Sequence, residues 1–326
     1  LIEFASELLN LKENISIKEG FSEAVFVDRE NQLAKIESSL SNRNNKIVVI
    51  AHLYYKNLVS QILDYLENIK EEFDLIITLP TWGTKDIIEQ VEIRYPEALF
   101  YKCVNRGRDI GPFIDLLPII LNKKYDLALK LHTKNGYFQA GEFISAYSQL
   151  WRDESLTALL GSEKRVNTII SAFKDNLKLN MVGASPFFLP FSMYPYSDDG
   201  EFLNEILEID LESNKGGFFA GTMFWFRPEV FDLLISKANL SLRSFDLEQG
   251  ANDGEIAHIL ERAFGHLAVY NNGVVAGVDV DLIQEEILKF NLRPAKKPIS
   301  KHFEEQKLRL GSMLKEELLK RYGSLL

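Results

Sequence analysis

The chain has 326 residues, of which 46% are hydrophobic and 26% charged, as in a folded soluble protein rather than a disordered one. Its 37 Lys and Arg residues against 47 Asp and Glu residues give a formal net charge of -10, which argues against a nucleic-acid partner. The single cysteine, Cys103, excludes a disulfide framework and a zinc site built from thiolates.

Apolar stretches such as Ile47–Ala51 fall far below the roughly 20 residues that a spanning helix needs. The segment Leu1–Asn14 lacks the basic and apolar regions of a signal peptide. We therefore expect a cytoplasmic protein, either free or bound peripherally at the inner face of the membrane. The sequence does not begin with Met, and we expect it to be part of a longer chain.

The first half of the chain alternates strand and helix signals. Short runs rich in β-branched residues predict buried strands, and apolar residues three or four apart predict the helices between them. The predicted strands are Lys46–His52, Asp74–Leu79, Leu99–Val104 and Tyr125–Leu131, and the predicted helices are Asn57–Ile69, Thr84–Arg94 and Asp109–Leu121. This order is typical of a parallel sheet covered by helices on both faces.

The second half is less regular. The predicted helices are Phe143–Leu160, Glu163–Leu177, Gly254–Phe264 (ended by Gly265) and Lys301–Tyr322, the predicted strands are Asn180–Ser185, Phe218–Phe226 and His266–Tyr270, and the predicted loops include Ser41–Asn45, Asn135–Gly141, Phe187–Gly200 and Arg293–Pro298. The fold class expected is α/β with a mostly parallel sheet. We expect an N-terminal helical extension at 1–45, a main domain at 46–280 and a C-terminal helical extension at 281–326.

Polar residues gather where the predicted strands end, which is where parallel sheets bind ligands. The candidates are His52 and Tyr54 after the first strand, Asn105, Arg108 and Asp109 after the third, and Lys130, His132 and Lys134 at the fourth. From Lys102 to Asn135 there are seven basic and three acidic residues, a local charge of +4. Such a basic focus in an acidic chain suits a diphosphate. The alternative is that these charges pair with surface carboxylates.

Known phosphate and nucleophile motifs are absent from the sequence. There is no G-x-x-x-x-G-K-[ST], no G-x-G-x-x-G after a strand and no G-x-S-x-G. ATP hydrolysis, dinucleotide binding and a serine hydrolase are therefore disfavoured.

The run from Gly216 to Arg227 combines three glycines with several aromatic residues. Glycines allow a ligand to approach the backbone closely, and aromatic rings can stack on a sugar. Gly221, Thr222 and Arg227 are the candidates for substrate binding. The alternative, a buried strand, suits the phenylalanines better.

The segment Asn252–Arg262 places a carboxylate and an imidazole on one helical stripe, through Glu255 and His258. Asp253, Glu255 and His258 are candidate catalytic residues, because a carboxylate can take the proton of an attacking hydroxyl. Asp253 has an alternative role as helix N-cap, and His258 as a hydrogen-bonded structural histidine. His132 and His258 could share a metal, although no ligand spacing supports this.

Four segments together resemble the rhamnan synthesis protein F family of bacterial polysaccharide assembly enzymes. They are Asn105–Phe113 (NRGRDIGPF), Lys130–Lys134 (KLHTK), Phe219–Trp225 (FAGTMFW) and Glu255–Arg262 (EIAHILER). The resemblance extends from about His52 to Gly273. Members are regarded as glycosyltransferases, and the sequence looks like the single Rossmann-like type called GT-A.

The resemblance implies a role for each group of candidates. His52 and Tyr54 would face the nucleotide, while Asn105, Arg108 and Asp109 would lie along the nucleotide and its ribose. The Asp-x-Asp that usually holds a divalent cation in GT-A enzymes is replaced here by Leu131–Lys134. No cofactor is therefore firmly predicted, with Mg²⁺ or Mn²⁺ as the alternative, and lysines 130 and 134 could offset the diphosphate charge instead. The acidic catalytic residue would lie at Asp253 or Glu255.

The function expected is transfer of a sugar from a nucleotide-sugar donor, by family analogy dTDP-L-rhamnose, with inversion at the anomeric carbon. The acceptor would be a growing cell-surface polysaccharide of capsule, O-antigen or cell wall, or a lipid-linked glycan. An adjacent glycosyltransferase domain in a longer chain is a further expected partner. The alternative function is a non-catalytic carbohydrate-binding or assembly module of a larger polysaccharide synthase.

Overall fold

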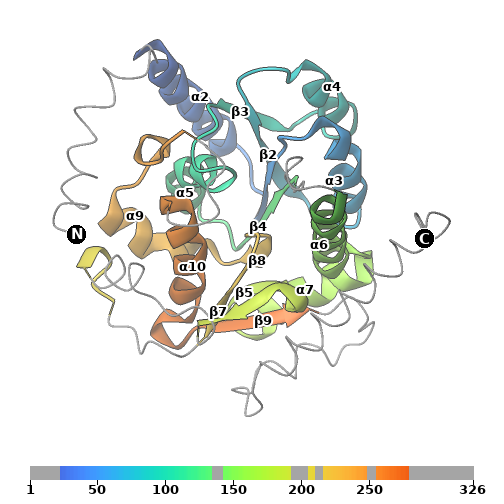
Figure 1. Cartoon of the computed structure of the whole chain (residues 1–326), viewed down its shortest axis with the longest axis vertical. Coiled ribbons are helices and arrows are strands. Elements are labelled where there is room, and N and C mark those ends of the chain that lie inside the picture. Colours follow the sequence, from blue (N-terminus) through green and yellow to red (C-terminus); the bar gives the residue numbers. More distant parts are fainter. Residues whose placement is uncertain (1–22, 134–141, 192–204, 210–215, 248–254, 279–326) are drawn as a thin grey trace.

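The computed structural model describes residues 23–133, 142–191, 205–209, 216–247 and 255–278. A seven-stranded sheet runs through its centre in the order β3-β2-β1-β4-β8-β5-β9 (Figure 1). The strands are β1 (Ile47–His52), β2 (Phe73–Pro80), β3 (Leu99–Cys103), β4 (Leu127–His132), β5 (Leu179–Ala184), β8 (Phe224–Phe226) and β9 (Val274–Val278). Strands β1 to β4 are parallel, β8 is antiparallel to β4 and β5, and β9 is parallel to β5.

Helices cover both faces of the sheet (Figure 1). The helices are α2 (Glu23–Ser41), α3 (Val59–Leu66), α4 (Lys85–Arg94), α5 (Ile110–Lys123), α6 (Glu142–Leu160), α7 (Glu163–Asp175), α9 (Asp232–Ala238) and α10 (Ile256–Val269). Short 3-10 turns lie at Lys56–Leu58, Ser185–Phe187, Pro228–Phe231, Leu242–Ser244 and Tyr270–Asn272. Helices α2, α5, α9 and α10 pack on one face, and α3, α4, α6 and α7 on the other. The predicted Rossmann-like α/β class is confirmed.

The alternation of side chains along each strand builds two cores. Val48 and Ile50 of β1 lie in the core under α5 and α10, whereas Ile47 and Val49 lie in the core under α3 and α6. All four side chains are buried, which explains why the strand is apolar throughout instead of alternating with polar residues. Burying each such side chain contributes about 1.5–3 kcal/mol.

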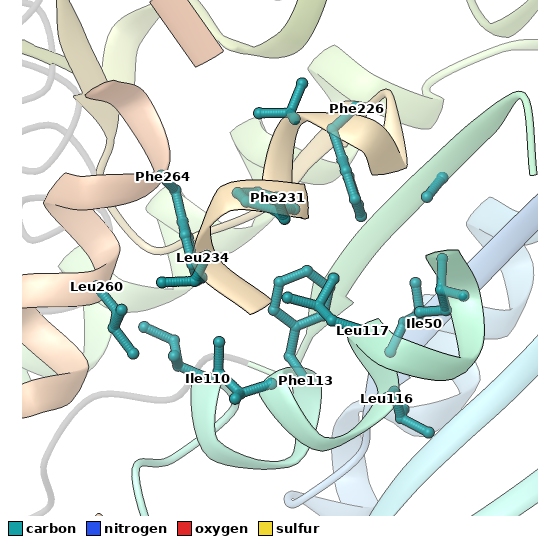
Figure 2. Packing of buried hydrophobic residues seen from close by; sticks show 14 of the residues in the cluster. Ile50, Ile110, Phe113, Leu116, Leu117, Phe226, Phe231, Leu234, Leu260 and Phe264 are labelled. Atoms are coloured by element: carbon teal, nitrogen blue, oxygen red, sulfur yellow. The ribbon is translucent and has the colours of Figure 1, made fainter. Parts of the chain in front are cut away.

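Phe113 of α5 is the centre of one core (Figure 2). Its ring makes edge-to-face contacts with Phe226, Phe231 and Phe264, with ring centroids 5.7, 5.8 and 5.7 Å away. Edge-to-face pairs of this kind add about 0.5–1.5 kcal/mol each to the burial of the rings. The cluster joins α5, β8 and α10.

The predicted strand Phe218–Phe226 is wrong, because the chain turns in its middle. Residues Gly217–Phe219 form β7, which pairs with β6 (Phe188–Pro190) in a separate two-stranded sheet, and only Phe224–Phe226 joins the main sheet. The turn between them holds Gly221 at φ +85° and Thr222 at φ +53°. Strand β6 also occupies part of the predicted loop Phe187–Gly200.

The predicted helix end at Gly265 and the strand His266–Tyr270 are also wrong. Helix α10 runs through Gly265 to Val269. A Cβ atom at Gly265 would lie 2.2 Å from the Gly217 carbonyl oxygen, so this glycine allows the helix to approach β7 rather than ending it. The strand of this region is β9, which follows the helix.

Helix α2 packs closely on the main domain. Ile36 and Leu40 are buried in the core that contains α5. Arg29 forms an ion pair with Asp115 of α5 at 2.5 Å, and the Gln32 amide bonds the backbone N–H and carbonyl of Lys102 in β3. The Gln32 contacts cover part of the hydrogen-bonding edge of an outer strand.

Several predictions fall outside the described residues: the helix Lys301–Tyr322, the C-terminal extension at 281–326, and the loops at 135–141 and 293–298. Among the helices that the structure describes, none has the length and apolarity needed to cross a bilayer.

Candidate active site

The carboxyl ends of β1 and β4 form the topological switch point of the sheet. From β1 the chain adds β2 and β3 on one side, and β4 then pairs on the other side of β1. Crevices that bind ligands open at such points in α/β sheets. His52 and His132 pair across the two strands here, and Thr78 of β2 pairs with His52 on its other side.

These polar residues share one face of the sheet. Ile50 lies two residues before His52, and Ala128 lies four residues before His132; both belong to the core under α5 and α10. Because every second side chain of a strand points to the same face, His52 and His132 lie on that face too. The His52 Nδ1 atom lies 2.8 Å from the Thr78 hydroxyl. Burial lowers the pKa of His52 to about 4, aided by the charges of His132 and Lys130 and opposed by that of Asp109.

Lys130 is a buried cation between two chain segments. Its ammonium pairs with the carboxylate of Asp109, which immediately precedes α5, and donates to the Thr222 hydroxyl at 2.8 Å. The Thr222 hydroxyl in turn donates to Asp109 Oδ2 at 2.6 Å. The ammonium also lies 5.4 Å from the centre of the Phe113 ring. This closed triangle joins β4, the start of α5 and the turn before β8.

The electrostatics of this triangle favour an ionised Asp109. Burial alone would raise its pKa, but the charges of His132 and Lys130 and the hydrogen bonds from Lys130 and Thr222 outweigh burial and lower the pKa far below its usual range. Burial lowers the pKa of Lys130, while Asp109 and Glu261 oppose that effect. The pair is therefore an ion pair whose charges largely cancel.

The turn at Gly221 and Thr222 is held from both sides. The Gly221 N–H donates to Glu261 Oε1 of α10 at 2.5 Å, and its carbonyl accepts from His132 Nε2 at 2.5 Å. Because a carbonyl only accepts, His132 carries a proton on Nε2. A β-branched residue rarely adopts a positive φ, and Thr222 at +53° represents about 1–3 kcal/mol of strain that these contacts maintain.

Helices α5 and α10 both begin at this edge. Arg108, at φ +55°, precedes α5, and His258 lies in the first turn of α10, with Arg108 Nη1 and His258 Nε2 3.4 Å apart. Glu255 is the N-cap of α10 and forms a capping box with His258, whose Nδ1 lies 3.4 Å from the Glu255 N–H. A neutral imidazole has one acceptor nitrogen. In His258, Nε2 faces the Arg108 guanidinium and Nδ1 faces the Glu255 N–H, so a neutral His258 accepts a hydrogen bond from one of these two donors at a time.

The structure brings together most of the predicted site residues. Those joined by the contacts above are His52, Arg108, Asp109, Lys130, His132, Gly221, Thr222, Glu255 and His258. Tyr54 adjoins His52, with ring centroids 6.2 Å apart, and Asn105 is half-buried in the loop between β3 and α5. Lys134 and Asp253 lie outside the described residues.

Arg227 lies apart from this group. Because β8 is antiparallel to β4, Arg227 at its end lies at the opposite edge of the sheet. Its guanidinium donates to the backbone carbonyls of Leu179, Phe173 and Asn176. These contacts secure the end of α7 to β5.

The predicted helix start at Gly254 is a further correction, since α10 begins at Ile256 with Glu255 as its N-cap, which also removes the alternative role of Asp253 as N-cap of this helix. The sequence favours this earlier start because aspartate is a preferred N-cap residue.

The donor set at this edge does not fit a divalent cation site of the Asp-x-Asp kind. Within the part of the chain that the structure describes, no group of three His, Cys, Asp or Glu side chains is arranged to hold a metal ion. Asp109, whose carboxylate is 13% exposed, is bound by Lys130 and Thr222.

Sequence reasoning missed four residues of this region. Thr133 accepts from the N–H groups of Tyr54 and Tyr55 at 2.9 and 3.1 Å and thereby joins the loops after β1 and β4. Glu261 holds the Gly221 turn. Thr78 and Trp82 lie at and just after the end of β2, where the strand-end rule applies as it does to the other strands.

The comparisons with known proteins identify the family. A sequence profile of rhamnan synthesis protein F matches residues 9–273. The chain belongs to this family. Membership of the rhamnan synthesis protein F family indicates a role in polysaccharide biosynthesis.

Two relatives from Xanthomonas campestris pv. campestris, strains B100 and ATCC 33913, are both named uncharacterized protein WxcX. Each is 31% identical over 227 residues, which cover 69% of this chain and 31% of the relative. The chain thus spans about a third of these relatives. An RNA-free ribonuclease P of Methanocaldococcus jannaschii is 21% identical over 159 residues, covering 47% of this chain and 60% of the relative, which supports no statement about activity.

Proposed function

We propose that this domain is a glycosyltransferase that binds a nucleotide-sugar donor in the crevice between β1 and β4. One observation carries the proposal: all four family-like segments meet at one edge of the sheet. Asp109, Lys130 with His132, Gly221 with Thr222, and Glu261 come from the four segments and form one hydrogen-bonded network. By analogy with the family name, the donor is dTDP-L-rhamnose and the acceptor a growing cell-surface polysaccharide.

Arg108 and His258 are the groups we assign to the diphosphate. A phosphate oxygen between Arg108 Nη1 and His258 Nε2 would accept from both, and it would leave Nδ1 to accept from Glu255. The beginnings of α5 and α10 add the positive ends of two helix dipoles to the same place. As the leaving diphosphate gains charge, these donors would stabilise it.

Lys130 takes a positioning role in this proposal. Its ammonium is buried against Asp109 and Thr222, so its charge is already balanced within the protein. It holds the start of α5 against the Gly221 turn, and the turn in turn orients His132 through the Gly221 carbonyl. Gly107 and Arg108 immediately precede the start of α5, so fixing that helix start also sets the direction of the Arg108 backbone.

An inverting transfer needs a base that removes the proton of the acceptor hydroxyl. We assign this role to Glu255, the N-cap of α10, or to Asp253, which lies outside the described residues. The positive end of the helix dipole favours the ionised form of Glu255, which is the form that a base requires. Glu255 also caps α10, so replacing it should affect the stability of the protein as well as turnover, and the variants of the two candidates can thereby be told apart.

The test is an assay of nucleotide release and product formation with dTDP-L-rhamnose and a panel of other nucleotide sugars, each with rhamnan oligosaccharides as acceptors. The proposal expects release of nucleoside diphosphate that depends on the acceptor, together with a rise in melting temperature when the donor alone is added. Absence of both effects across the panel would contradict it.

A second candidate function is a non-catalytic carbohydrate-binding or assembly module. The observation in its favour is that this chain covers only 31% of the length of the WxcX relatives. A transferase centre elsewhere in such a protein would leave this domain a binding role. This function predicts that glycans raise the melting temperature and that nucleotide sugars do not.

A further inference from the structure

An exposed tryptophan stands at the edge of the candidate site. Trp82 follows β2 and is 68% exposed, and it is the one aromatic among the exposed large hydrophobic side chains of the described residues. The other two tryptophans of the chain are engaged in packing: Trp225 is fully buried, and Trp151 stacks on Phe187 at 4.8 Å. The exposed ring of Trp82 leaves a large apolar surface in water.

The surroundings of Trp82 hold its ring beside the switch point. The ring meets Tyr54 edge to face, with centroids 6.3 Å apart at 82°, and Tyr54 lies 6.2 Å from the His52 ring at 26°. Two hydrogen bonds to Thr133 fix the backbone of the Tyr54 loop, and an ion pair between Lys56 and Asp86 joins this loop to α4. A row of rings therefore extends from the switch point at His52 outward to Trp82.

The aromatic and charged groups lie on opposite sides of the switch point. In the strand order, Tyr54 and Trp82 follow β1 and β2, whereas His132 and the Gly221 turn lie on the β4 and β8 side. Arg108 and Asp109 follow β3, but they contact His258 of α10 and Lys130 of β4, on the β4 side. A nucleotide sugar has the same polarity, with an aromatic base at one end, the diphosphate in the middle and the transferred sugar at the other end.

We propose that Trp82 and Tyr54 form the base-binding site of the donor nucleotide, with the base stacked on the exposed face of Trp82. This inference rests on the proposed function, and it assigns a direction to the bound donor. The base lies over the loops after β1 and β2, and the transferred sugar lies towards Gly221 and the start of α10, where the acceptor enters.

The experiment compares Trp82→Ala and Trp82→Phe with the unchanged chain, by calorimetry, for two ligands: dTDP and inorganic diphosphate. Stacking on an aromatic ring is worth a factor of roughly 5 to 150 per base. We expect Trp82→Ala to weaken dTDP binding by that factor and Trp82→Phe to restore most of it, with diphosphate binding unchanged in both. Ile93→Ala, which removes an exposed apolar side chain of α4, is the matched control and should bind both ligands as the unchanged chain does.

Tryptophan fluorescence gives a readout that a purely structural role would not change. Because Trp82 is the exposed tryptophan, dTDP should shield it from an aqueous quencher such as iodide, and this protection should be lost in Trp82→Phe. Rhamnan oligosaccharides should give no such protection.

Three outcomes would overturn the inference. If dTDP binds equally well to Trp82→Ala and leaves Trp82 open to iodide, the base lies elsewhere while the proposed function stands. If oligosaccharide protects Trp82 and dTDP does not, the rings serve the acceptor. If the unchanged chain binds neither dTDP nor any nucleotide sugar, the proposed function fails and the base site fails with it.

Discussion

The two edges of the central sheet each hold a paired carboxylate: Asp74, which is fully buried, and Asp109, whose side chain is 13% exposed. At the amino edge, Asp74 accepts hydrogen bonds from Tyr125 at 2.6 Å, from Arg43 at 3.1 Å and from Asn45 at 3.0 Å. At the carboxyl edge, Asp109 is bound by Lys130 and Thr222. Both carboxylates are satisfied, so burial and pairing alone do not distinguish a site from a structural network.

The difference lies in what surrounds each carboxylate. Asp74 connects the segments that precede β1, β2 and β4, and its partners do no more than fix how these strands start. Asp109 lies beside a strained Thr222 and at an edge that also holds two histidines at the switch point and two helix N-termini. Functional groups tend to cluster at switch points and at strained backbone, and the carboxyl edge combines the switch point of β1 and β4 with positive φ angles at Arg108 and Thr222.

The largest effect is expected from removing the proposed catalytic base, Asp253 or Glu255. Asp253→Asn and Glu255→Gln each keep a polar side chain that can accept a hydrogen bond, so folding should be preserved. At the true base the change should lower turnover by about 10²–10⁴-fold with nearly unchanged donor affinity. The measurement is kcat with saturating donor, accompanied by calorimetric donor binding.

The capping role of Glu255 makes the two variants distinguishable. Loss of an N-cap costs about 0.5–2 kcal/mol, so Glu255→Ala should lower the free energy of unfolding whether or not Glu255 is the base. If both amide variants turn over at the rate of the unchanged chain, the start of α10 is scaffold only and the base must be sought elsewhere.

A second test compares the buried networks of the two edges. Lys130→Met leaves the Asp109 carboxylate buried without its cation and should lower the free energy of unfolding by about 3–5 kcal/mol. Tyr125→Phe leaves Asp74 with Arg43 and Asn45 and should cost about 1 kcal/mol. Urea unfolding measures both values.

The variant Lys130→Met combined with Asp109→Asn removes both charges and should recover part of the loss. Equal losses for Lys130→Met and Tyr125→Phe would mean that the carboxyl-edge ion pair is no more strongly coupled than the amino-edge network.

The sequence was sufficient to predict the parallel half of the fold, because its strands are buried on both faces and read as continuous β-branched runs such as Ile47–Ala51. The strand-end rule then predicted most of the residues that meet at the carboxyl edge. The prediction of secondary structure failed at Phe218–Phe226, since the turn there depends on Thr222, a residue whose local preference opposes a positive φ. It failed again at Gly265, whose role is a contact with Gly217, 48 positions away in the chain.

Long-range contacts explain what remained unpredicted in the site. The hydrogen bond of Glu261 to the Gly221 N–H requires α10 to pack beside the turn, and no local pattern encodes that distance. The sequence alone presents Lys130 as a free cation, whereas its ion pair with Asp109 suits the positioning role that we propose for it. That ion pair also depends on long-range packing.

A smaller effect should appear as a pH dependence of stability. The pKa of His52 is lowered to about 4 by burial, whereas an unfolded histidine has a pKa near 6.5. Below pH 6.5 the unfolded chain binds a proton that the folded chain does not, so the free energy of unfolding falls as the pH falls from about 7 to about 4. The contribution of His52 should be about 2 kcal/mol by pH 5.

The comparison for this prediction is His266, which is stacked on Phe191 in the core and whose pKa is also lowered to about 4 by burial. His52→Gln and His266→Gln should each reduce the pH dependence of urea unfolding between pH 7 and pH 5. A pH dependence unaltered by His52→Gln would show that His52 does not stay neutral in the crevice.

The smallest effect is expected from metal removal. Since no Asp-x-Asp follows β4 and Asp109 is held by Lys130, we expect turnover to stay within about twofold after exhaustive treatment with EDTA. Complete loss of activity in EDTA, restored by Mn²⁺ or Mg²⁺, would assign a cation to the carboxyl edge and would point to His132 as a ligand.

The most direct test of the account is a calorimetric titration of dTDP-L-rhamnose into the unchanged chain, Arg108→Ala and Arg94→Ala. Alanine keeps the Cβ atom at the left-handed position 108, and Arg94 lies in the last turn of α4 at the amino edge, paired with Asp64 and Glu67. The account predicts binding by the unchanged chain, a loss of about 1.5–3 kcal/mol in binding free energy for Arg108→Ala, and a change below about 0.5 kcal/mol for Arg94→Ala. Equal affinity in Arg108→Ala and the unchanged chain would contradict a donor site at the carboxyl edge of β1 and β4.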